Sequence, residues 1–386
     1  MANVQTIYFM HKDILVAELD YNLSSKIITT LRLYNKQHLP VGTRNPKTGN
    51  LIEAFNAWFK NRCIPYDRPD THNIFFKSEY VSYLDLMKNN FLCSLTDCYW
   101  FKTEDTKDFK WNDVNFFNND FTSNLGEKIF FDSPVEINNY NSPDITTAGA
   151  LPKYWFKNTD NQYYLLKDSF RRKDGYQYYN EPVCEVFTSE LMKLYNLPVT
   201  PYFFTTIYNK LYCACPNFID NDMKEFVSME MVGQEVGGSK RKAYETFCEL
   251  GFKKEMDQIT LIDYLIGNGD RHHNNIGYIR NPDTLQIIGL APCFDSGGGM
   301  AFDYDQGIAV EKAGSKLYYR DEEESLSLID DFSWFINSSI TCDDICNLYY
   351  SLSTGYIDES VINLVIQKLR DRYNFLIQYI KEKETL

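Results

Sequence analysis

The chain has 386 residues, 44% of them hydrophobic and 24% charged, which is long enough for two or three domains with a large core. Its formal net charge of −14 argues against a general nucleic-acid surface, because Lys and Arg supply most of the affinity for phosphate backbones. No run approaches the roughly 18 apolar residues of a membrane span, and the N-terminus lacks a signal-peptide pattern. The ten cysteines are scattered, which favours reduced thiols. We therefore expect a cytoplasmic protein that binds neither a membrane nor nucleic acid directly.

Residues 1–140 are predicted to form an accessory domain of mixed α and β structure. Short elements are expected over residues 1–20 (a hairpin), 51–59 and 80–87 (helices). Residues 94–100 are predicted to be a packing element. Residues 105–140 show no clear period, but they are rich in Trp and Phe. That composition argues against disorder, because such a chain can bury apolar surface.

Residues 141–232 are predicted to form a β-rich lobe, and residues 233–386 a mainly helical lobe. The first lobe is expected to contain a hairpin ending in strand 163–167, a helix over 181–195, strands over 200–207 and 210–214, and a connecting segment over 215–219. The second lobe is expected to contain helices over 244–266, from a Thr341–Asp344 capping box to about residue 352, and over 361–380. Residues 301–325 are predicted to be loop or strand that covers the substrate.

A compact polar cluster lies between the expected helix 244–266 and two strand-like runs. Asp270 and Asn275 belong to this cluster, and Asp295, followed by Ser and Gly, comes after the second run. Phosphoryl transfer needs one carboxylate to orient the attacking hydroxyl, and a carboxylate with an amide oxygen to hold Mg²⁺ against the phosphates. The base and the amide are five positions apart in protein kinases, as Asp270 and Asn275 are here. We therefore predict that Asp270 is catalytic and that Asn275 and Asp295 bind Mg²⁺.

These residues carry a resemblance to a known family. Asp-Arg-His-x-x-Asn at 270–275, followed by Ala-Pro-x-Phe-Asp at 291–295, resembles the HipA-type serine/threonine kinases, including the related CtkA kinases. The Asp-Arg-His form is also similar to phosphatidylinositol 3/4-kinases. The resemblance implies an α+β, bilobal protein-kinase-like fold for the region after residue 140, with ATP and Mg²⁺ as cofactors. It also implies transfer of the ATP γ-phosphate to Ser or Thr of a protein substrate, in the bacterial cytoplasm. Several family members are toxins neutralised by a small DNA-binding antitoxin, so such a partner is a further expectation.

Two charged positions in the first lobe fit the same chemistry. Lys167 closes a strand well ahead of the catalytic carboxylate, where kinases carry the lysine that neutralises the α- and β-phosphates. The helix 181–195 is predicted to carry the carboxylate that pairs with this lysine. The resemblance favours Glu185, although Cys184 replaces the family's Asn before it. Glu181 remains the alternative.

The remaining predicted nucleotide contacts lie on loops. Phe218 lies in the segment 215–219, where a kinase hinge passes the edge of the adenine. Small residues beside Gly149 allow close approach of the backbone to phosphate, and Lys153 adds charge, so residues 142–153 are predicted to cover the nucleotide. In HipA-like kinases the matching loop carries a Ser or Thr that the kinase itself phosphorylates, and Thr146 and Thr147 hold that place here. Phosphate at this position is predicted to repel the triphosphate and to lower activity.

Three other functions remain open on the sequence. A lipid or small-molecule kinase would share Asp-Arg-His, but no basic face for an anionic membrane is visible. A metal-dependent hydrolase using His272, His273 and Asp295 would leave Lys167 and the Glu-bearing helix unexplained. A nucleotide-binding regulator without activity would keep the fold alone. We predict that His272 and His273 shape the catalytic loop and do not bind zinc.

Overall fold

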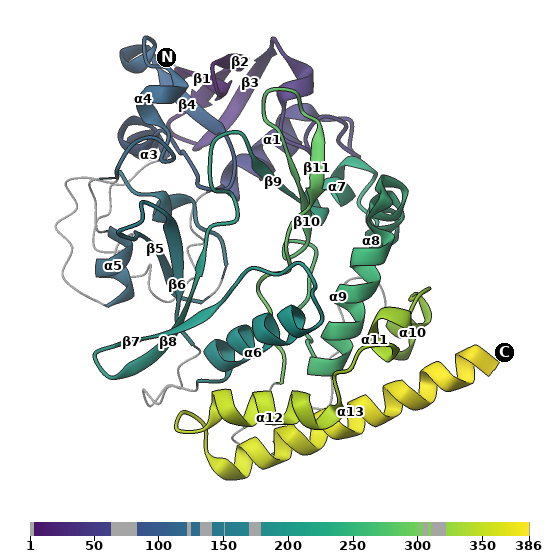
Figure 1. The fold of residues 1–386 in the computed structure, drawn as a ribbon. Coiled ribbons are helices and arrows are strands. Elements are labelled where there is room, and N and C mark those ends of the chain that lie inside the picture. The colour runs from purple at the N-terminus through teal and green to yellow at the C-terminus, as the bar shows by residue number, and fades with distance from the viewer. Residues whose placement is uncertain are drawn as a thin grey trace. The chain divides into compact units, whose positions relative to one another are not determined.

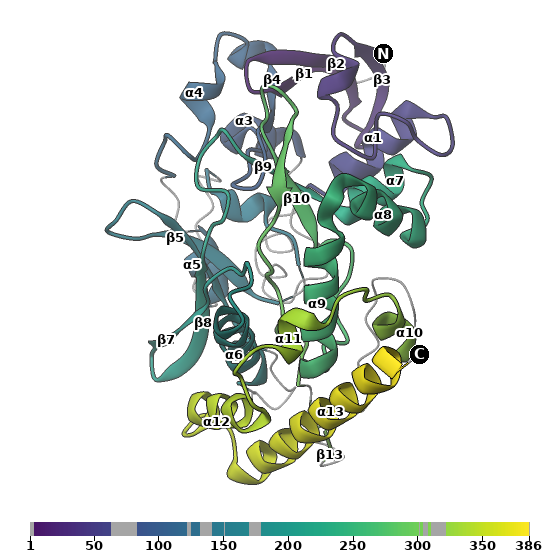
Figure 2. The same cartoon turned by 45° about the vertical axis from the view of Figure 1, so that its right-hand side comes forward.

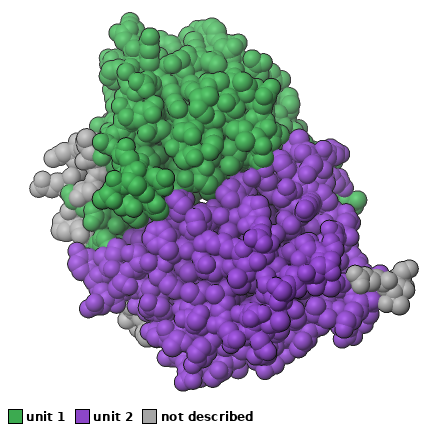
Figure 3. Space-filling model, viewed as in Figure 1, with its two compact units in different colours: residues 1–165, 217–242, 278–289 green, residues 166–216, 243–277, 290–386 purple. Residues whose placement is uncertain are grey.

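The computed structural model describes residues 4–62, 83–121, 125–131, 141–149, 151–169, 179–300, 302–303, 308–309 and 322–385. It divides into two compact units, which Figure 3 colours separately. Unit 1 comprises residues 1–165, 217–242 and 278–289, and unit 2 comprises residues 166–216, 243–277 and 290–386. The domain boundaries expected at residues 140 and 232 remain predictions.

Unit 1 contains a four-stranded antiparallel sheet near the N-terminus (Figure 1). The strand order is β3–β2–β1–β4, with β1 at Val4–His11, β2 at Ile14–Asn22, β3 at Ile27–Leu33 and β4 at Tyr99–Thr103. The predicted hairpin over residues 1–20 is therefore confirmed as β1 and β2, joined by a turn in which Lys12 has a φ of 48°. Helix α1 (Leu51–Lys60) and helix α3 (Tyr83–Asn90) match the helices expected over 51–59 and 80–87.

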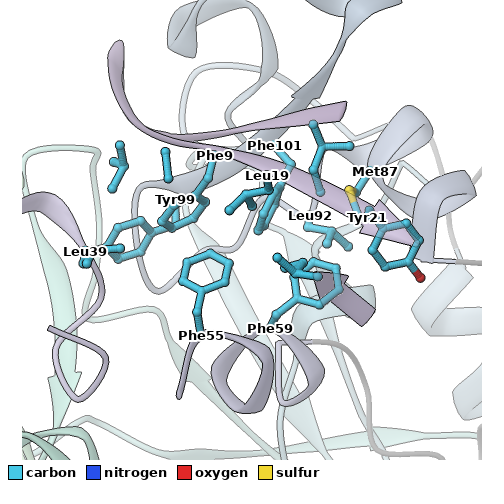
Figure 4. Packing of buried hydrophobic residues seen from close by; sticks show 14 of the residues in the cluster. Phe9, Leu19, Tyr21, Leu39, Phe55, Phe59, Met87, Leu92, Tyr99 and Phe101 are labelled. Carbon is cyan, nitrogen blue, oxygen red and sulfur yellow. The ribbon is translucent and has the colours of Figure 1, made fainter. Parts of the chain in front are cut away.

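Successive side chains of a strand point to opposite faces of the sheet, so the strands contribute apolar side chains to two separate clusters. Ile7 and Phe9 of β1 belong to one cluster, in which the Phe9 and Phe55 rings lie edge to face with centroids 4.9 Å apart. Figure 4 shows Phe55 and Phe59 of α1 directed at this face of the sheet. Met10 belongs to a second cluster. Both faces of the sheet are therefore covered.

The predicted packing element at 94–100 joins segments that are distant in sequence. Asp97 accepts two hydrogen bonds of 2.8 Å from Arg62, whose guanidinium also donates to the Tyr99 carbonyl at 2.6 Å. The Thr96 carbonyl accepts from the N–H of Phe226 at 2.8 Å. The side chain of Asp97 thus neutralises a buried cation and supports unit 1.

The remaining elements of unit 1 are short. They are α4 (Trp111–Val114), α5 (Leu125–Phe130), a 3-10 turn at Pro143–Thr146, β5 (Lys153–Lys157), most of β6 (Tyr163–Lys167), α7 (Met229–Glu235) and a three-stranded sheet of order β11–β10–β9. In that sheet β9 is Glu225–Ser228, β10 is Gly277–Arg280 and β11 is Ile287–Leu290. Tryptophan and phenylalanine side chains of 111–121 enter the second apolar cluster, as the ring-rich composition predicted.

A buried polar cluster ties β9 and β10 to β1. Glu225 accepts hydrogen bonds from His11 Nε2 at 3.0 Å and from Arg280 Nε at 2.6 Å, and His11 Nδ1 lies 2.9 Å from His38 Nδ1. Burial raises the pKa of Glu225, but its electrostatic and hydrogen-bond contacts with His11 and Arg280 outweigh this and bring that pKa to about 2. The carboxylate is therefore ionised inside the fold at any pH above that value.

We expect unit 1 to lose stability as the pH falls below about 4.5. The pKa of Glu225 is about 2 in the folded chain and 4.5 ordinarily, so protonation favours the unfolded chain throughout this window. The stabilisation is fully present above pH 4.5, and the difference between the two pKa values corresponds to about 3 kcal/mol in the free energy of unfolding. Urea unfolding of the wild type and of Glu225→Gln, followed from pH 7 to pH 3, measures it. An equally steep acid loss in Glu225→Gln would contradict the assignment.

Unit 2 combines the end of β6, one hairpin and most of the long helices. The hairpin is β7 (Phe203–Ile207) with β8 (Lys210–Pro216), paired antiparallel, and β8 lies between β7 and β6. The helices are α6 (Asn180–Leu194), most of α8 (Lys240–Phe247), α9 (Lys253–Ile266), α10 (Glu322–Ser327), α11 (Ser333–Ile336), α12 (Cys342–Ser353) and α13 (Glu359–Thr385). Figures 1 and 2 show α12 beside α6 and α13, which it contacts. Short strands β12 (Phe302–Asp303) and β13 (Ile308–Ala309) pair with each other.

The helices of unit 2 differ from the sequence prediction at two points, one of which is that α10 begins at Glu322, inside the segment 301–325 that was predicted as loop or strand. The Thr341–Asp344 capping box starts α12 as predicted. The helix expected over 244–266 is instead two helices, because Gly251 adopts a φ of 92° within a π-turn at Cys248–Phe252. Most of the predicted covering segment 301–325 lies outside the described residues. In the part of the chain that the structure describes, no helix is both long and apolar enough to cross a membrane.

Candidate active site

The predicted catalytic residues of the second lobe and Lys167 with Glu185 all belong to unit 2. Helix α9 ends at Gly267, which takes the left-handed conformation with φ 64° and ψ 43°. The loop after it carries Asp270, an exposed residue. Asn275 ends the same loop, is buried, and donates its backbone N–H to the His272 carbonyl at 2.9 Å. Asp295 follows β11 on a second loop.

Lys167 binds two of the predicted carboxylates at once. Its ammonium donates to Glu185 Oε1 and, at 2.5 Å, to Asp295 Oδ1. The Lys167 and Glu185 side chains are 6% and 2% exposed, whereas the Asp295 side chain is 36% exposed. Burial lowers the pKa of Lys167, but the carboxylates of Asp295 and Glu185 outweigh it and hold the ammonium protonated. The structure thus joins Lys167 to Glu185, the carboxylate that the resemblance favours over Glu181.

Glu185 also fixes the loop that carries Asp295. Its second oxygen, Oε2, accepts a 2.8 Å hydrogen bond from the backbone N–H of Ser296. The Cys184 thiol donates to the Ser296 carbonyl at 3.0 Å. Glu185 and Cys184 of α6 therefore bind the backbone N–H and the backbone carbonyl of Ser296, respectively. Cys184 thus contacts this loop from the position where the resemblance would place Asn.

A buried Asp–Arg pair links the loops that carry Asp270 and Asp295. Arg271 is fully buried and donates to Asp263 of α9 through Nε at 2.9 Å and Nη2 at 3.1 Å. The same guanidinium donates to the Phe294 carbonyl at 2.5 Å and to Ser296 Oγ at 2.8 Å. Asp263 therefore anchors, through Arg271, the loop that presents Asp295.

The same carboxylate positions Asp270 through an asparagine. Asn268 donates from Nδ2 to Asp263 Oδ1 at 2.8 Å, and its Oδ1 accepts from the Asp270 N–H at 3.1 Å. On the facing loop, a Cβ added at Gly298 would lie 2.7 Å from the Asp270 Cβ, too close for any side chain. The hydrogen bond to Asn268 thus fixes the backbone of Asp270, and the backbone of Gly298, which follows Asp295, lies close to the Asp270 side chain.

Asp295 itself has an unusual backbone conformation. Its φ is 58°, in the left-handed region that residues other than glycine rarely adopt. Conformations of this kind cost about 1–3 kcal/mol and persist where the surroundings fix them, which is often at functional sites. The contacts of Arg271 and Glu185 supply such fixation on either side.

The donors near these loops fit Mg²⁺ better than zinc. Asn275 and Asp295 offer oxygen atoms, which hard cations prefer, and Mg²⁺ typically takes one or two protein carboxylates and keeps several waters. Among the described residues no three His, Cys, Asp or Glu side chains lie together as a metal site. The structural role of His272 and His273 remains a prediction.

The other predicted site residues lie in unit 1. Gly149 has a φ of 103°, and a Cβ there would lie 2.3 Å from Lys153 Nζ, so these two residues are neighbours as expected for one loop. Thr146 donates to the Cys93 carbonyl at 2.8 Å. Thr147, which is buried, donates to the Pro143 carbonyl at 3.0 Å. The nucleotide and modification roles of these residues remain predictions.

The predicted hinge residue Phe218 also lies in unit 1. Its ring packs edge to face on Phe226, with centroids 5.7 Å apart. Its contact with adenine remains a prediction.

The sequence did not reveal the residues that support the site. Asp263, Asn268 and Ser296 carry no local pattern that differs from ordinary helix, turn and loop residues. Arg271 is the exception, because it lies next to Asp270 within the Asp-Arg-His motif and the sequence could therefore indicate that it belongs to the site.

Comparisons with known proteins support the fold. No protein-family model and no curated protein matches the chain. Among solved structures, a chain of the Shewanella oneidensis MR-1 toxin–antitoxin complex of HipA, HipB and operator DNA matches with a TM-score of 0.52 and 12% identity, over 95% of this chain and 96% of that one. The Helicobacter pylori proinflammatory kinase CtkA matches with a TM-score of 0.43 and 16% identity, over 57% of this chain and 90% of that one. The match along nearly the whole chain confirms the predicted α+β fold of the HipA type, and at this identity the likeness concerns the fold.

Proposed function

We propose that the chain is an ATP- and Mg²⁺-dependent serine/threonine protein kinase of the HipA-like type. The observation that carries the proposal is the Lys167–Glu185–Asp295 ion cluster, because a lysine that neutralises phosphates, its helix-borne glutamate and a metal-binding aspartate are the parts that phosphoryl transfer needs. The Asp263–Arg271 pair supports this cluster and the Asp270 loop together.

Each residue has a distinct role in this proposal. Lys167 binds the α- and β-phosphates while Glu185 holds its ammonium in place. Asn275 and Asp295 would hold Mg²⁺, which neutralises charge on the phosphates when bound. Asp270 accepts the proton of the attacking hydroxyl and orients it, consistent with its exposure on the loop.

The test is direct. The thermal transition of the purified chain is measured with ATP alone, Mg²⁺ alone and both, and the protein is then incubated with radiolabelled ATP and a mixed protein substrate. A shift with ATP and Mg²⁺ plus labelled Ser or Thr supports the proposal. A shift without transfer would identify a regulator that lacks activity, and label in phosphoinositide vesicles but not in protein would identify a lipid kinase.

The same incubation tests the predicted modification of Thr146 or Thr147. Both hydroxyls are hydrogen-bonded to backbone carbonyls, so phosphate at either position must displace this turn. A phosphate brings about −1.5 to −2 charges, and displaced beside the triphosphate it would weaken ATP binding. Mass spectrometry of peptide 142–153 decides the point, with the Asp270→Asn variant as control. Unmodified peptide in active enzyme ends this part of the proposal.

A small DNA-binding antitoxin is the partner that we propose for the chain. The support is the similarity of fold to the complex whose description names HipA, HipB and operator DNA. Toxicity on expression that a co-expressed neighbouring gene relieves would support this partner. Expression without any effect on growth would count against it.

A further inference from the structure

A tyrosine outside the recognised motifs contacts both members of the Lys167–Asp295 pair. Tyr202 immediately precedes β7 in unit 2 and is buried. Its hydroxyl accepts a 3.3 Å hydrogen bond from the backbone N–H of Asp295. The ammonium of Lys167 lies over its ring, 5.4 Å from the centroid. One side chain thus contacts the phosphate-binding cation and the metal-binding residue.

The backbone around Tyr202 is fixed to the elements that form the site. Its N–H donates to Ser189 Oγ of α6 at 3.1 Å. Two residues earlier, the N–H of Thr200 donates to the Cys293 carbonyl at 2.9 Å, and the N–H of Cys293 donates to the Pro198 carbonyl at 3.1 Å. Tyr202 is therefore held in register with the helix of Glu185 and with the segment that leads into Asp295.

The hydroxyl meets Asp295 where its backbone is strained. A left-handed aspartate at a φ of 58° is disfavoured unless its neighbours fix it. Arg271 donates to the carbonyl of Phe294 at 2.5 Å and to that of Asp295 at 3.4 Å, and Glu185 accepts from the N–H of Ser296. Tyr202 is the partner that binds the N–H of Asp295 itself.

We infer that Tyr202 is a positioning residue, whose hydroxyl holds Asp295 in the left-handed conformation that aims its carboxylate at Mg²⁺ and whose ring supports the Lys167 ammonium. This inference rests on the proposed kinase function for the metal and nucleotide. The geometric part of the inference, that Tyr202 restrains the Asp295 loop, depends only on contacts within the protein and not on a bound ligand.

Two substitutions separate the hydroxyl from the ring. Tyr202→Phe keeps the ring under Lys167 and removes the acceptor for Asp295, so we expect the Mg²⁺ concentration needed for nucleotide binding to rise about 2- to 10-fold, the range of one neutral hydrogen bond. ATP binding measured without Mg²⁺ should hardly change. Tyr202→Leu removes the ring as well, so it should weaken ATP binding in both conditions. A fall in kcat with an unchanged KM for ATP at saturating Mg²⁺ would not fit this pattern.

The matched control is Tyr195→Phe. Tyr195 is also buried, caps the far end of α6, and keeps its stacking on Phe335 when the hydroxyl is removed. It should change neither the Mg²⁺ dependence nor the Asp295 loop, although both variants lose one buried hydroxyl.

Hydrogen exchange of the ligand-free protein tests the geometry without activity. Peptides covering residues 293–300 should exchange several-fold faster in Tyr202→Phe than in the wild type or in Tyr195→Phe. Equal exchange in all three proteins would overturn the positioning role. Faster exchange with an unchanged Mg²⁺ dependence would overturn the link to the metal. A wild type that binds no ATP with Mg²⁺ would refute the kinase proposal and the metal role with it, and the exchange data would still decide whether Tyr202 restrains the loop.

Discussion

Replacing Asp270 by Asn is expected to lower phosphoryl transfer by about 10²- to 10⁴-fold, the usual contribution of a positioned general base. The variant keeps the side-chain shape beside Gly298 and the hydrogen bond from the Asp270 N–H to Asn268, so the loop should keep its conformation. In the proposed mechanism Asp270 acts on the attacking hydroxyl and not on the nucleotide, so ATP affinity should hardly change.

The measurement pairs single-turnover transfer rates with calorimetric ATP binding. Asn275→Asp is a useful companion, because it alters a proposed metal ligand on the same loop and should change Mg²⁺ dependence more than the transfer step. Full transfer by Asp270→Asn would show that another group orients the hydroxyl.

Replacing Lys167 by Met is expected to abolish measurable ATP binding and to lower the free energy of unfolding by about 3–5 kcal/mol. The stability loss follows because Glu185 is 2% exposed and would lose the cation that neutralises it, which is the usual cost of breaking a buried ion pair. The lost binding follows because no phosphate-neutralising cation remains at this position.

A double variant separates the two effects. Lys167→Met with Glu185→Gln removes the unpaired buried charge, so urea unfolding should recover much of the stability while ATP binding stays lost. A matched pair on the surface, Lys193 with Glu190 of the same helix, is largely exposed, and Lys193→Met should cost little. If the double variant were as unstable as Lys167→Met, the loss would come from packing and not from the charge of Glu185.

The sequence predicted the parts of the site that follow local rules. Asp270, Asn275 and Asp295 were recognisable because their spacing around two strands is set by the chain itself. The resemblance favoured Glu185 as the partner of Lys167, but Cys184 in place of the family's Asn left Glu181, one helical turn earlier, as the alternative. Only the tertiary placement of α6 decides which turn reaches the lysine, and in the structure it is the turn of Glu185.

The supporting residues could not be predicted for the same reason. Arg271 and Tyr202 act through contacts between segments that are far apart in the chain, such as the 3.3 Å hydrogen bond from Asp295 to Tyr202, and Asp263 reaches the loop of Asp295 only through Arg271. Residues 217–242 and 278–289 likewise pack with the first 165 residues in unit 1, although they flank or interrupt the helical segment that was predicted as one lobe. Hydrophobic periodicity identifies elements but not which distant elements they pack against.

The shared ammonium of Lys167 has a consequence for how ligands enter. The ammonium pairs with both Glu185 and Asp295, so a phosphate that binds Lys167 in the proposed kinase would compete with Asp295 for the same positive charge. In the proposed kinase, Asp295 would hold Mg²⁺, and Lys167 would then be available to bind phosphate. We therefore expect metal and nucleotide binding to be coupled, each raising the affinity for the other by the same factor, as linkage between two sites requires.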